Sequence, residues 1–577
     1  MTARRIWLLA GALVLAGCVS VPTSGPVVEG RAAGDPVPPP NVAVLATGPR
    51  EGDSPVAIVD GFLAAMSSYE PGYATARQFL TPEAAAQWRP ESGIAVYGAG
   101  EGSRTVSETE DGVTISLALV SRVEEDGSSS AVEEGSRLVL DLAVEQVGGQ
   151  WRIATPPDGL VMTAFDFTRE FASFASYFFD PAYDVLVPDL TYLPVRGNLP
   201  TLLVEELLDG PTAWLEPAVR SALGPGVGLA TGTVVQAGTL ARVDLTAQVR
   251  TTSAAQRDRL AAQLAWTLRQ APGVAEVQVL ADGQPLPLPR SQTGIVSADQ
   301  YASYDPAEVP AGDELFAVAD GRVVAVDDEQ ADPVPGPLGE PGGYRSAAVS
   351  RNGLEAIAVS EDGSTLTRGR LAAGAEAQTL ELGSDLGVPS YDRENRVWLV
   401  DRGTTSSRVL LLEEEPDPVR ISAGLLEQVR VERLILAPDG VRAAAVYQTE
   451  SGPRLLLALV LVRPDGTLEL GQPRDLPLEQ VDPVDVAWAS ATALALLASD
   501  EGDPQPYLVE LSNAALSSRG EVSGAQSLTV SPGQPLVVGT GPVAVEGFDE
   551  PQPVVLRQDA LQEWVPLVPG RAPTYPG

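Results

Sequence analysis

The chain has 577 residues, a formal charge of −39 at pH 7, one Cys, no His, and Arg as its only basic residue type. These absences exclude His-dependent nucleophiles, Schiff-base lysines, internal disulfides and thiolate zinc sites, leaving carboxylate chemistry or calcium binding. The acidity disfavours nucleic acid as a partner; it favours solubility, with a basic partner surface as the alternative.

The length and composition predict about three domains with much β-structure. A single hydrophobic core stops growing at roughly 250–300 residues, well short of this chain. The 50 Pro and 56 Gly indicate many turns and favour short strands over long helices. The 44% hydrophobic fraction is typical of a globular protein.

Residues 1–17 have the layout of a lipoprotein signal peptide. Arg4 and Arg5 precede an apolar run over residues 6–15, which is too short to span a bilayer core that needs ~20 apolar residues. The run ends in "LAGC", which resembles the bacterial lipobox, in which the cysteine receives a diacylglycerol. Two acyl chains anchor a protein stably where one is marginal. We therefore predict lipidation of Cys18; an unlipidated secreted protein and a retained membrane anchor are the alternatives.

Residues 18–53 are rich in Pro, Gly, Ser and Thr and show no usable periodicity. A Pro-rich segment is extended and semi-rigid. We expect a tether that holds the folded part away from the cytoplasmic membrane, on its extracytoplasmic face.

Residues 54–180 are predicted to form an α+β domain. Ser54 and Thr81 are each followed by Pro, the pattern of a helix N-cap and first helical position. The pattern then changes to period two, which predicts strands of an antiparallel sheet. The apolar residues of two such strands are Val113, Ile115, Leu117, Leu119 and then Leu138, Leu140, Leu142, Val144. The order of helices and strands resembles the nuclear-transport-factor-like fold.

An aromatic series ends this domain. It could line a ligand pocket, but aromatic residues at such spacing are more often core or an interdomain seam. Its members are Phe165, Phe167, Phe171, Phe174, Tyr177, Phe178 and Phe179.

Residues 181–300 are predicted to form a compact α/β domain. Asn198 begins one helix and Gly210 ends it, and a capping box from Ser253 to Gln256 begins another. A strand over Leu240–Leu245 precedes the second helix, and a strand over residues 274–280 follows it. Strand, helix and strand at this spacing form a βαβ-like unit.

Residues 303–577 contain an internal repeat of a turn followed by an apolar strand. The turns lie at Asn352, Asn395, Asp439, Ser490 and Gly533, with steps close to the ~40–50 residues of a propeller blade. The earlier hairpin "LFAVADGRVVAV" adds a further blade, so five or six blades fit. A β-sandwich is the structural alternative.

Two acidic runs, Asp327-Asp328-Glu329 and Glu413-Glu414-Glu415, are candidates for calcium or glycosidase carboxylates. Neither has the spacing of an EF-hand calcium loop, and Pro-flanked charge runs are usually solvated loops. We therefore predict no catalytic residue, no metal site and no cofactor.

Several longer stretches resemble known families. "LLDGPTAWLEPAVRSALGPG", "ARVDLT" and "QLAWTLRQAPGVAEVQVLADGQPL" are similar to the GerMN domain of germination proteins. "VSVPTSGP", "WRIATPPDGLVM" and "YFFDPAYDVLVPDLTYLP" resemble the LpqB lipoprotein family of high-GC Gram-positive bacteria. This resemblance implies a C-terminal β-propeller and an association with the MtrA/MtrB two-component system through the extracellular part of its sensor kinase.

The sequence thus predicts a multidomain, non-enzymatic protein that is lipid-anchored and extracytoplasmic. It would bind proteins, modulating an MtrB-like sensor kinase in cell-envelope homeostasis. A module that binds cell-wall glycan or peptide is the second hypothesis, and a carboxylate-based envelope hydrolase is the third.

Overall fold

The structure is a computed structural model. It describes residues 46–577 except 101, 131, 134, 308–313, 328–329, 414–416, 479, 501 and 545–549. Cys18, the predicted signal peptide and most of the predicted tether lie outside the described residues. Within the described part, no helix combines the length and apolarity needed to cross a membrane.

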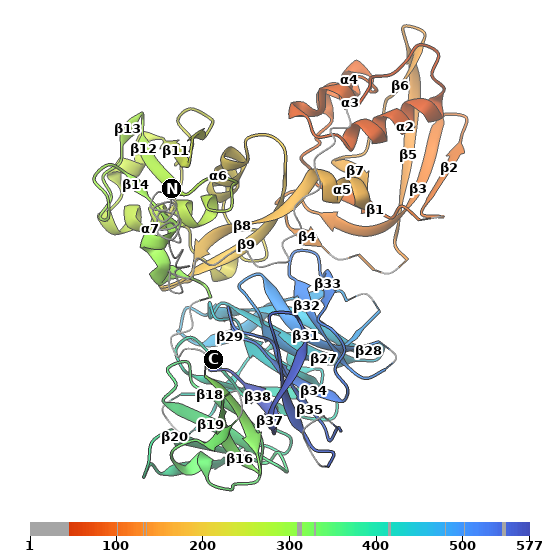
Figure 1. Cartoon of the computed structure of the whole chain (residues 1–577). Coiled ribbons are helices and arrows are strands. Elements are labelled where there is room, and N and C mark those ends of the chain that lie inside the picture. The colour runs from red at the N-terminus through yellow and green to blue at the C-terminus, as the bar shows by residue number, and fades with distance from the viewer. Residues whose placement is uncertain are drawn as a thin grey trace, which may run out of the picture. The chain divides into compact units, whose positions relative to one another are not determined.

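The N-terminal domain packs short helices against a seven-stranded sheet (Figure 1). The strand order is β6-β5-β3-β1-β7, with β2 and β4 paired to β3. The sheet is antiparallel, as expected, except that β1 and β7 run parallel. Its elements are α2 (Pro55–Met66), η1 (Pro71–Tyr73), α3 (Ala74–Arg77), α4 (Pro82–Gln87), β1 (Ile94–Tyr97), β2 (Arg104–Glu108), β3 (Gly112–Val123), β4 (Ser129–Ser130), β5 (Arg137–Val147), β6 (Gln150–Ile153) and β7 (Leu160–Thr163).

Local sequence signals explain this domain. The Ser54 hydroxyl accepts a hydrogen bond from the Ala57 amide at 3.3 Å, and Thr81 caps α4 in the same way at 3.2 Å to Ala84. Period-two residues of β3, among them Ile115, face the core because alternate side chains of a strand point to one face.

A long hairpin follows the short helix α5 (Ala164–Glu170) and belongs to two cores. It pairs β8 (Phe171–Phe179) with β9 (Leu186–Pro194) along their whole length. Phe171 lies in the core of the N-terminal domain, whereas Phe178 and Phe179 lie in the core of the next one. The aromatic series is therefore core and seam, apart from Phe165, which is 70% exposed. The expected boundary at residue 180 falls in the turn of this hairpin.

The second domain has the predicted βαβ-like unit. Strand β11 and strand β12 are parallel neighbours, joined through α7, whose Ser253–Gln256 capping box is present. Its elements are α6 (Leu199–Asp209), η2 (Glu216–Ala218), β10 (Val235–Ala237), β11 (Leu240–Leu245), η3 (Ala247–Thr251), α7 (Ala254–Leu268), β12 (Glu276–Ala281), β13 (Gln284–Pro285), β14 (Ile295–Val296) and η4 (Ala298–Tyr304).

The described residues after 314 form six four-stranded sheets, the blades of a propeller. The strands of blade 1 are β15 (Leu315–Ala319), β16 (Arg322–Val326), β17 (Ala331–Pro333) and β38 (Arg571–Thr574); those of blade 2 are β18 (Tyr344–Val349), β19 (Glu355–Ser360), β20 (Thr365–Arg370) and β21 (Ala377–Glu381). Blade 3 contains β22 (Ser390–Tyr391), β23 (Val397–Arg402), β24 (Ser407–Leu412) and β25 (Val419–Ile421), and blade 4 contains β26 (Val431–Leu436), β27 (Arg442–Thr449), β28 (Gly452–Val462) and β29 (Leu468–Leu476). Blade 5 contains β30 (Asp482–Trp488), β31 (Ala493–Ser499), β32 (Gln505–Glu510) and β33 (Leu516–Ser518), and blade 6 contains β34 (Ala525–Thr529), β35 (Val537–Thr540), β36 (Val554–Gln558) and β37 (Trp564–Pro569). Short 3-10 turns η5 (Pro337–Gly339) and η6 (Gly424–Glu427) connect strands.

The blades close into a ring. The innermost strands of the six blades contact one another in succession around the ring, in the order β38, β18, β22, β26, β30, β34 and back to β38. Blade 1 is completed by β38, which pairs with β15 from the opposite end of the domain (Figure 1). Each neighbouring pair of blades encloses its own hydrophobic cluster, because blade sheets bury both faces. The propeller expectation is confirmed with six blades, and the β-sandwich alternative is wrong.

The five turns found in the sequence occupy equivalent places, each between the first and second strands of blades 2 to 6. Four of these turns contain a residue with left-handed backbone: Gly353 (φ 68°), Asn395 (φ 59°), Gly440 (φ 73°) and Gly533 (φ 79°). Glycine tolerates this conformation best, and Asn is the side-chain-bearing residue that adopts it most readily.

Candidate functional site: a polar cleft between blades 2 and 3

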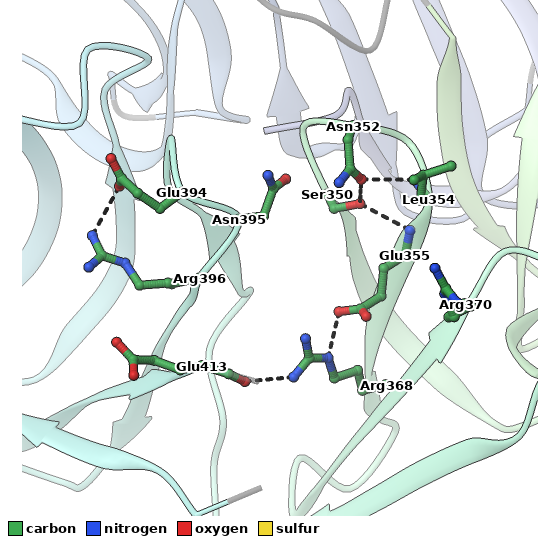
Figure 2. A pocket seen from close by; sticks show the side chains of 10 residues that line it. All are labelled: Ser350, Asn352, Leu354, Glu355, Arg368, Arg370, Glu394, Asn395, Arg396 and Glu413. Carbon is green, nitrogen blue, oxygen red and sulfur yellow. Dashed lines mark hydrogen bonds and ion pairs between the residues drawn. The ribbon is translucent and has the colours of Figure 1, made fainter. Parts of the chain in front are cut away.

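A cleft of about 640 Å³ lies between blades 2 and 3 of the propeller (Figure 2). Blade 2 contributes the turn at residues 350–355 and the end of β20, and blade 3 contributes the turn at residues 394–396 and the residue after β24. Among the described residues that line it, Leu354 alone has a fully apolar side chain. The volume falls within the roughly 300–1,000 Å³ typical of ligand sites.

The ion pair between Glu355 and Arg368 lies within blade 2, and each partner also bonds to blade 3. Arg368 Nε donates to Glu355 Oε1 at 2.5 Å, and its Nη1 donates to the backbone oxygen of Glu413 in blade 3 at 2.7 Å (Figure 2). The Tyr391 hydroxyl of blade 3 also donates to Glu355 Oε1, at 3.4 Å. These two residues are therefore occupied in holding the blades together.

Blade 3 supplies a second ion pair to the cleft. Arg396 Nη2 lies 3.0 Å from Glu394 Oε2, while its Nε donates to Asp392 Oδ2 at 2.7 Å. Asp392 is buried, and it also accepts from the Trp398 indole at 2.8 Å. The buried carboxylate thus fixes the orientation of Arg396, and Glu394 remains 57% exposed.

Two amide side chains lie on opposite sides of the cleft (Figure 2). Asn352 Oδ1 accepts from the Ser350 hydroxyl at 2.8 Å and from the Leu354 amide at 3.1 Å, which fixes its side chain. Asn395 Oδ1 is buried and has no hydrogen-bond partner among the described residues. A buried acceptor without a partner carries a desolvation cost that a bound donor would remove.

Two charged groups of the cleft are also open to a ligand. The guanidinium of Arg370 makes no ion pair or hydrogen bond with another described residue, and the carboxylate of Glu413 makes none either. Both residues are exposed. The cleft therefore combines an open cation, an open anion and two amides.

A separate charge cluster joins the opposite ends of blades 2 to 4. Asp385 accepts hydrogen bonds from Arg345, Arg402 and Arg430 at 2.7–3.0 Å. Burial raises the pKa of Asp385, but these three hydrogen bonds outweigh burial and lower it to about 2. Glu432 pairs with two of the same guanidiniums, at 3.3 and 2.8 Å. Because its groups satisfy one another, this cluster is structural.

Of the two acidic runs, the structure describes Asp327 and Glu413. Asp327 Oδ1 accepts from the Gln330 amide at 2.9 Å within a turn, and Glu413 lines the cleft. The other members lie outside the described residues. Among the residues that are described, no three or more Asp, Glu, His or Cys side chains gather as a metal site would require.

Sequence reasoning missed the cleft. The sequence marks Asn395 only as a turn residue, and it gives no signal at Arg370. A comparison of the repeats with one another was available: blades 2, 4 and 6 have Gly where blade 3 has Asn395. A polar side chain at a position that is glycine in these other repeats would have indicated a functional residue.

Three family models match successive parts of the chain. Residues 48–168 match the N-terminal domain of lipoprotein LpqB, and residues 321–576 match the LpqB β-propeller domain. Residues 175–287 match the Germane model, described as sporulation and spore germination. The first boundary lies between residues 168 and 175, at the start of the β8–β9 hairpin.

Solved structures resemble this chain only loosely. A nidogen/laminin complex matches with a TM-score of 0.34 at 14% identity, over 46% of this chain and 98% of that one. A TolB from Acinetobacter baumannii matches with a TM-score of 0.35 at 13% identity, over 59% and 87%.

Full-length relatives carry the assignment. Lipoprotein LpqB of Streptomyces avermitilis is 31% identical over 611 residues, covering 98% of this chain and 97% of the relative. LpqB of Streptomyces coelicolor is 31% identical with 99% and 97% covered, and LpqB of Thermobifida fusca is 29% identical with 98% and 97% covered. The chain therefore belongs to the LpqB lipoprotein family, with that family's N-terminal domain, a Germane (GerMN) domain and the family's β-propeller.

Proposed function

We propose that this chain is a lipid-anchored protein on the extracytoplasmic face of the cytoplasmic membrane, where its propeller binds another protein and adjusts envelope signalling. Membership of a lipoprotein family supports the anchor, and the "LAGC" motif supplies Cys18 as the lipidated residue. Two acyl chains on one cysteine give stable attachment. The proposed partner is the extracellular part of an MtrB-like sensor kinase.

The observation that carries protein binding is the cleft between blades 2 and 3. Its charges of both signs suit a polypeptide surface, and its open groups include Arg370, a residue type enriched at protein interfaces. The acidic chain as a whole also favours a partner with basic surface. A propeller fold alone would not support this function, because folds host many functions.

Chemical cross-linking in intact cells, followed by purification of the chain from membranes, tests this proposal. The sensor kinase should be recovered with the wild-type chain, and its yield should fall at least fivefold with Arg370→Glu. The matched control is Gly533→Asn, which adds a side chain to the equivalent turn of blade 6, where no atom lies within 4 Å of the added Cβ. Recovery of wall fragments without any membrane protein would contradict the proposal.

A module that binds cell-wall peptide is the second candidate. The cleft has amide and charged groups suited to a peptide, and none of its described lining residues is an aromatic on which a sugar ring could stack, so it favours peptide over glycan. Purified wall stem peptides, tested for binding to the full chain, distinguish this candidate from a protein partner.

A further inference from the structure

The groups that line the cleft fall into two classes. Glu355 and Arg368 are committed to the contact between the blades, and Arg396 is held by the buried Asp392. Four groups are not committed in this way: the Arg370 guanidinium, the Glu413 carboxylate, the Asn352 amide nitrogen and the Asn395 Oδ1. A ligand has to satisfy the second class.

The two amides suit a peptide backbone. A backbone offers an N–H donor and a C=O acceptor at every residue. The Asn352 amide nitrogen can donate to such a C=O, and the Asn395 amide oxygen can accept from such an N–H. Asn352 and Asn395 lie on opposite sides of the cleft, so an extended strand between them could exchange hydrogen bonds with both (Figure 2). The Asn395 Oδ1 is buried without a partner among the described residues, and a turn of this side chain toward the cleft would let it accept from a peptide N–H.

The position of Asn395 is the second argument. Its backbone is left-handed, and the corresponding residues of blades 2, 4 and 6 are glycines. Glycine would meet the backbone requirement with less strain, so stability does not explain an Asn here. The residue places a polar side chain where those blades have none.

The two charged groups specify the side chains of the ligand. An arginine binds a carboxylate with two parallel hydrogen bonds, and Arg370 is free to do so. Glu413 suits an ammonium or guanidinium group. One acidic and one basic side chain on the same strand would complement both.

We propose that the cleft between blades 2 and 3 binds an extended peptide segment bearing one acidic and one basic side chain, with Asn352 and Asn395 on its backbone, Arg370 on its carboxylate and Glu413 on its cation. The proposal rests on the proposed function, because it names the part of a partner that the propeller recognises. The recognition is by strand and charge, without a metal or an aromatic platform.

Selection of a phage-displayed library of 12-residue peptides against the full chain tests the proposal, with affinities of the selected peptides measured by fluorescence anisotropy. Selected peptides should share one acidic and one basic residue. Arg370→Glu should weaken the binding of these peptides at least tenfold. The same variant should bind more tightly than the wild type to versions of the peptides in which the acidic residue is replaced by Lys. Asn395→Gly should weaken binding at least fivefold while thermal stability is kept or increased. Gly533→Asn should leave binding unchanged and should lower thermal stability slightly, because the left-handed backbone at this position favours glycine.

The proposal is overturned if no peptide is enriched over a scrambled library, or if the selected peptides bind both cleft variants as tightly as the wild type. If the kinase does not cross-link but peptide binding depends on Arg370 and Asn395, the proposed kinase partner is wrong and the peptide-binding role of the cleft stands. Wall stem peptides that bind in the same Arg370-dependent manner would identify the wall as the source of the peptide.

Discussion

The buried pair of Asp439 and Arg442 in blade 4 offers a sharp test of how the propeller is held together. The side chains are 1% and 3% exposed, and Arg442 donates from Nε and Nη2 to Asp439 Oδ2 at 2.9 and 2.6 Å. Arg442 also reaches the Ala491 carbonyl of blade 5 at 2.7 Å. Asp439→Ala would leave a guanidinium buried without its counter-charge, which costs about 3–5 kcal/mol.

The turn adds to this loss, because Asp439 Oδ1 accepts from the amides of Val441 and Arg442 at 2.9 and 3.2 Å. A double variant that also carries Arg442→Met removes the stranded charge. It should recover most of the lost stability, since replacing a whole buried pair by apolar side chains is often close to neutral.

Hydrogen exchange of the full chain, followed by mass spectrometry, measures the effect locally. Amides of β27 and β31 should lose protection in the single variant, whereas those of α7 in the Germane domain serve as the internal reference. A loss below about 1 kcal/mol in the single variant, or a double variant that is no more stable than the single one, would refute the reasoning about the stranded charge.

Three further changes test other parts of the chain. Cys18→Ser should move the protein from the membrane fraction to the medium or leave an unprocessed precursor, as seen by fractionation and immunoblotting; a mature protein that stays anchored would contradict lipidation. Burial, and then the negative charge of Asp189, raise the pKa of Glu206 from 4.5 to about 7, so the folded state keeps a proton that the unfolded state loses and stability falls as pH rises from about 4.5 to about 7. Glu206→Gln should therefore raise the free energy of unfolding at pH 8, measured by urea denaturation, by up to about 3 kcal/mol, and leave it nearly unchanged at pH 4.5. Equal effects at both pH values would argue against the raised pKa. Ser253→Ala should cost about 1 kcal/mol in chemical unfolding, because it removes the hydroxyl that accepts from the Gln256 amide at 3.2 Å; an unchanged midpoint would mean that the capping box contributes nothing.

Signals that act over a few residues were readable from the sequence. Ser54, Thr81 and Ser253 each cap the helix predicted for them, because a cap depends only on the next three residues. The Leu240–Leu245 strand was found with its exact bounds, and the five propeller turns repeated in register. These features are local, so no knowledge of the tertiary fold was needed.

Features that depend on distant pairing were not readable. The β8–β9 hairpin was missed because both its faces are largely buried, which removes the period-two pattern that marks a half-exposed strand. Blade number stayed open because β38 is a short segment that becomes a blade strand only by pairing with β15. The cleft required two turns about forty residues apart to be placed side by side.

The closure of blade 1 by β38 has a consequence for the way the protein is made. Since β38 follows every other strand of the described residues, β15 has an open edge of unpaired N–H and C=O groups until β38 has been made and has paired with it. During that interval the open edge is a site at which a neighbouring copy can pair instead. Any delay in the pairing of β38 with β15 therefore lengthens the time in which the protein is open to misassembly.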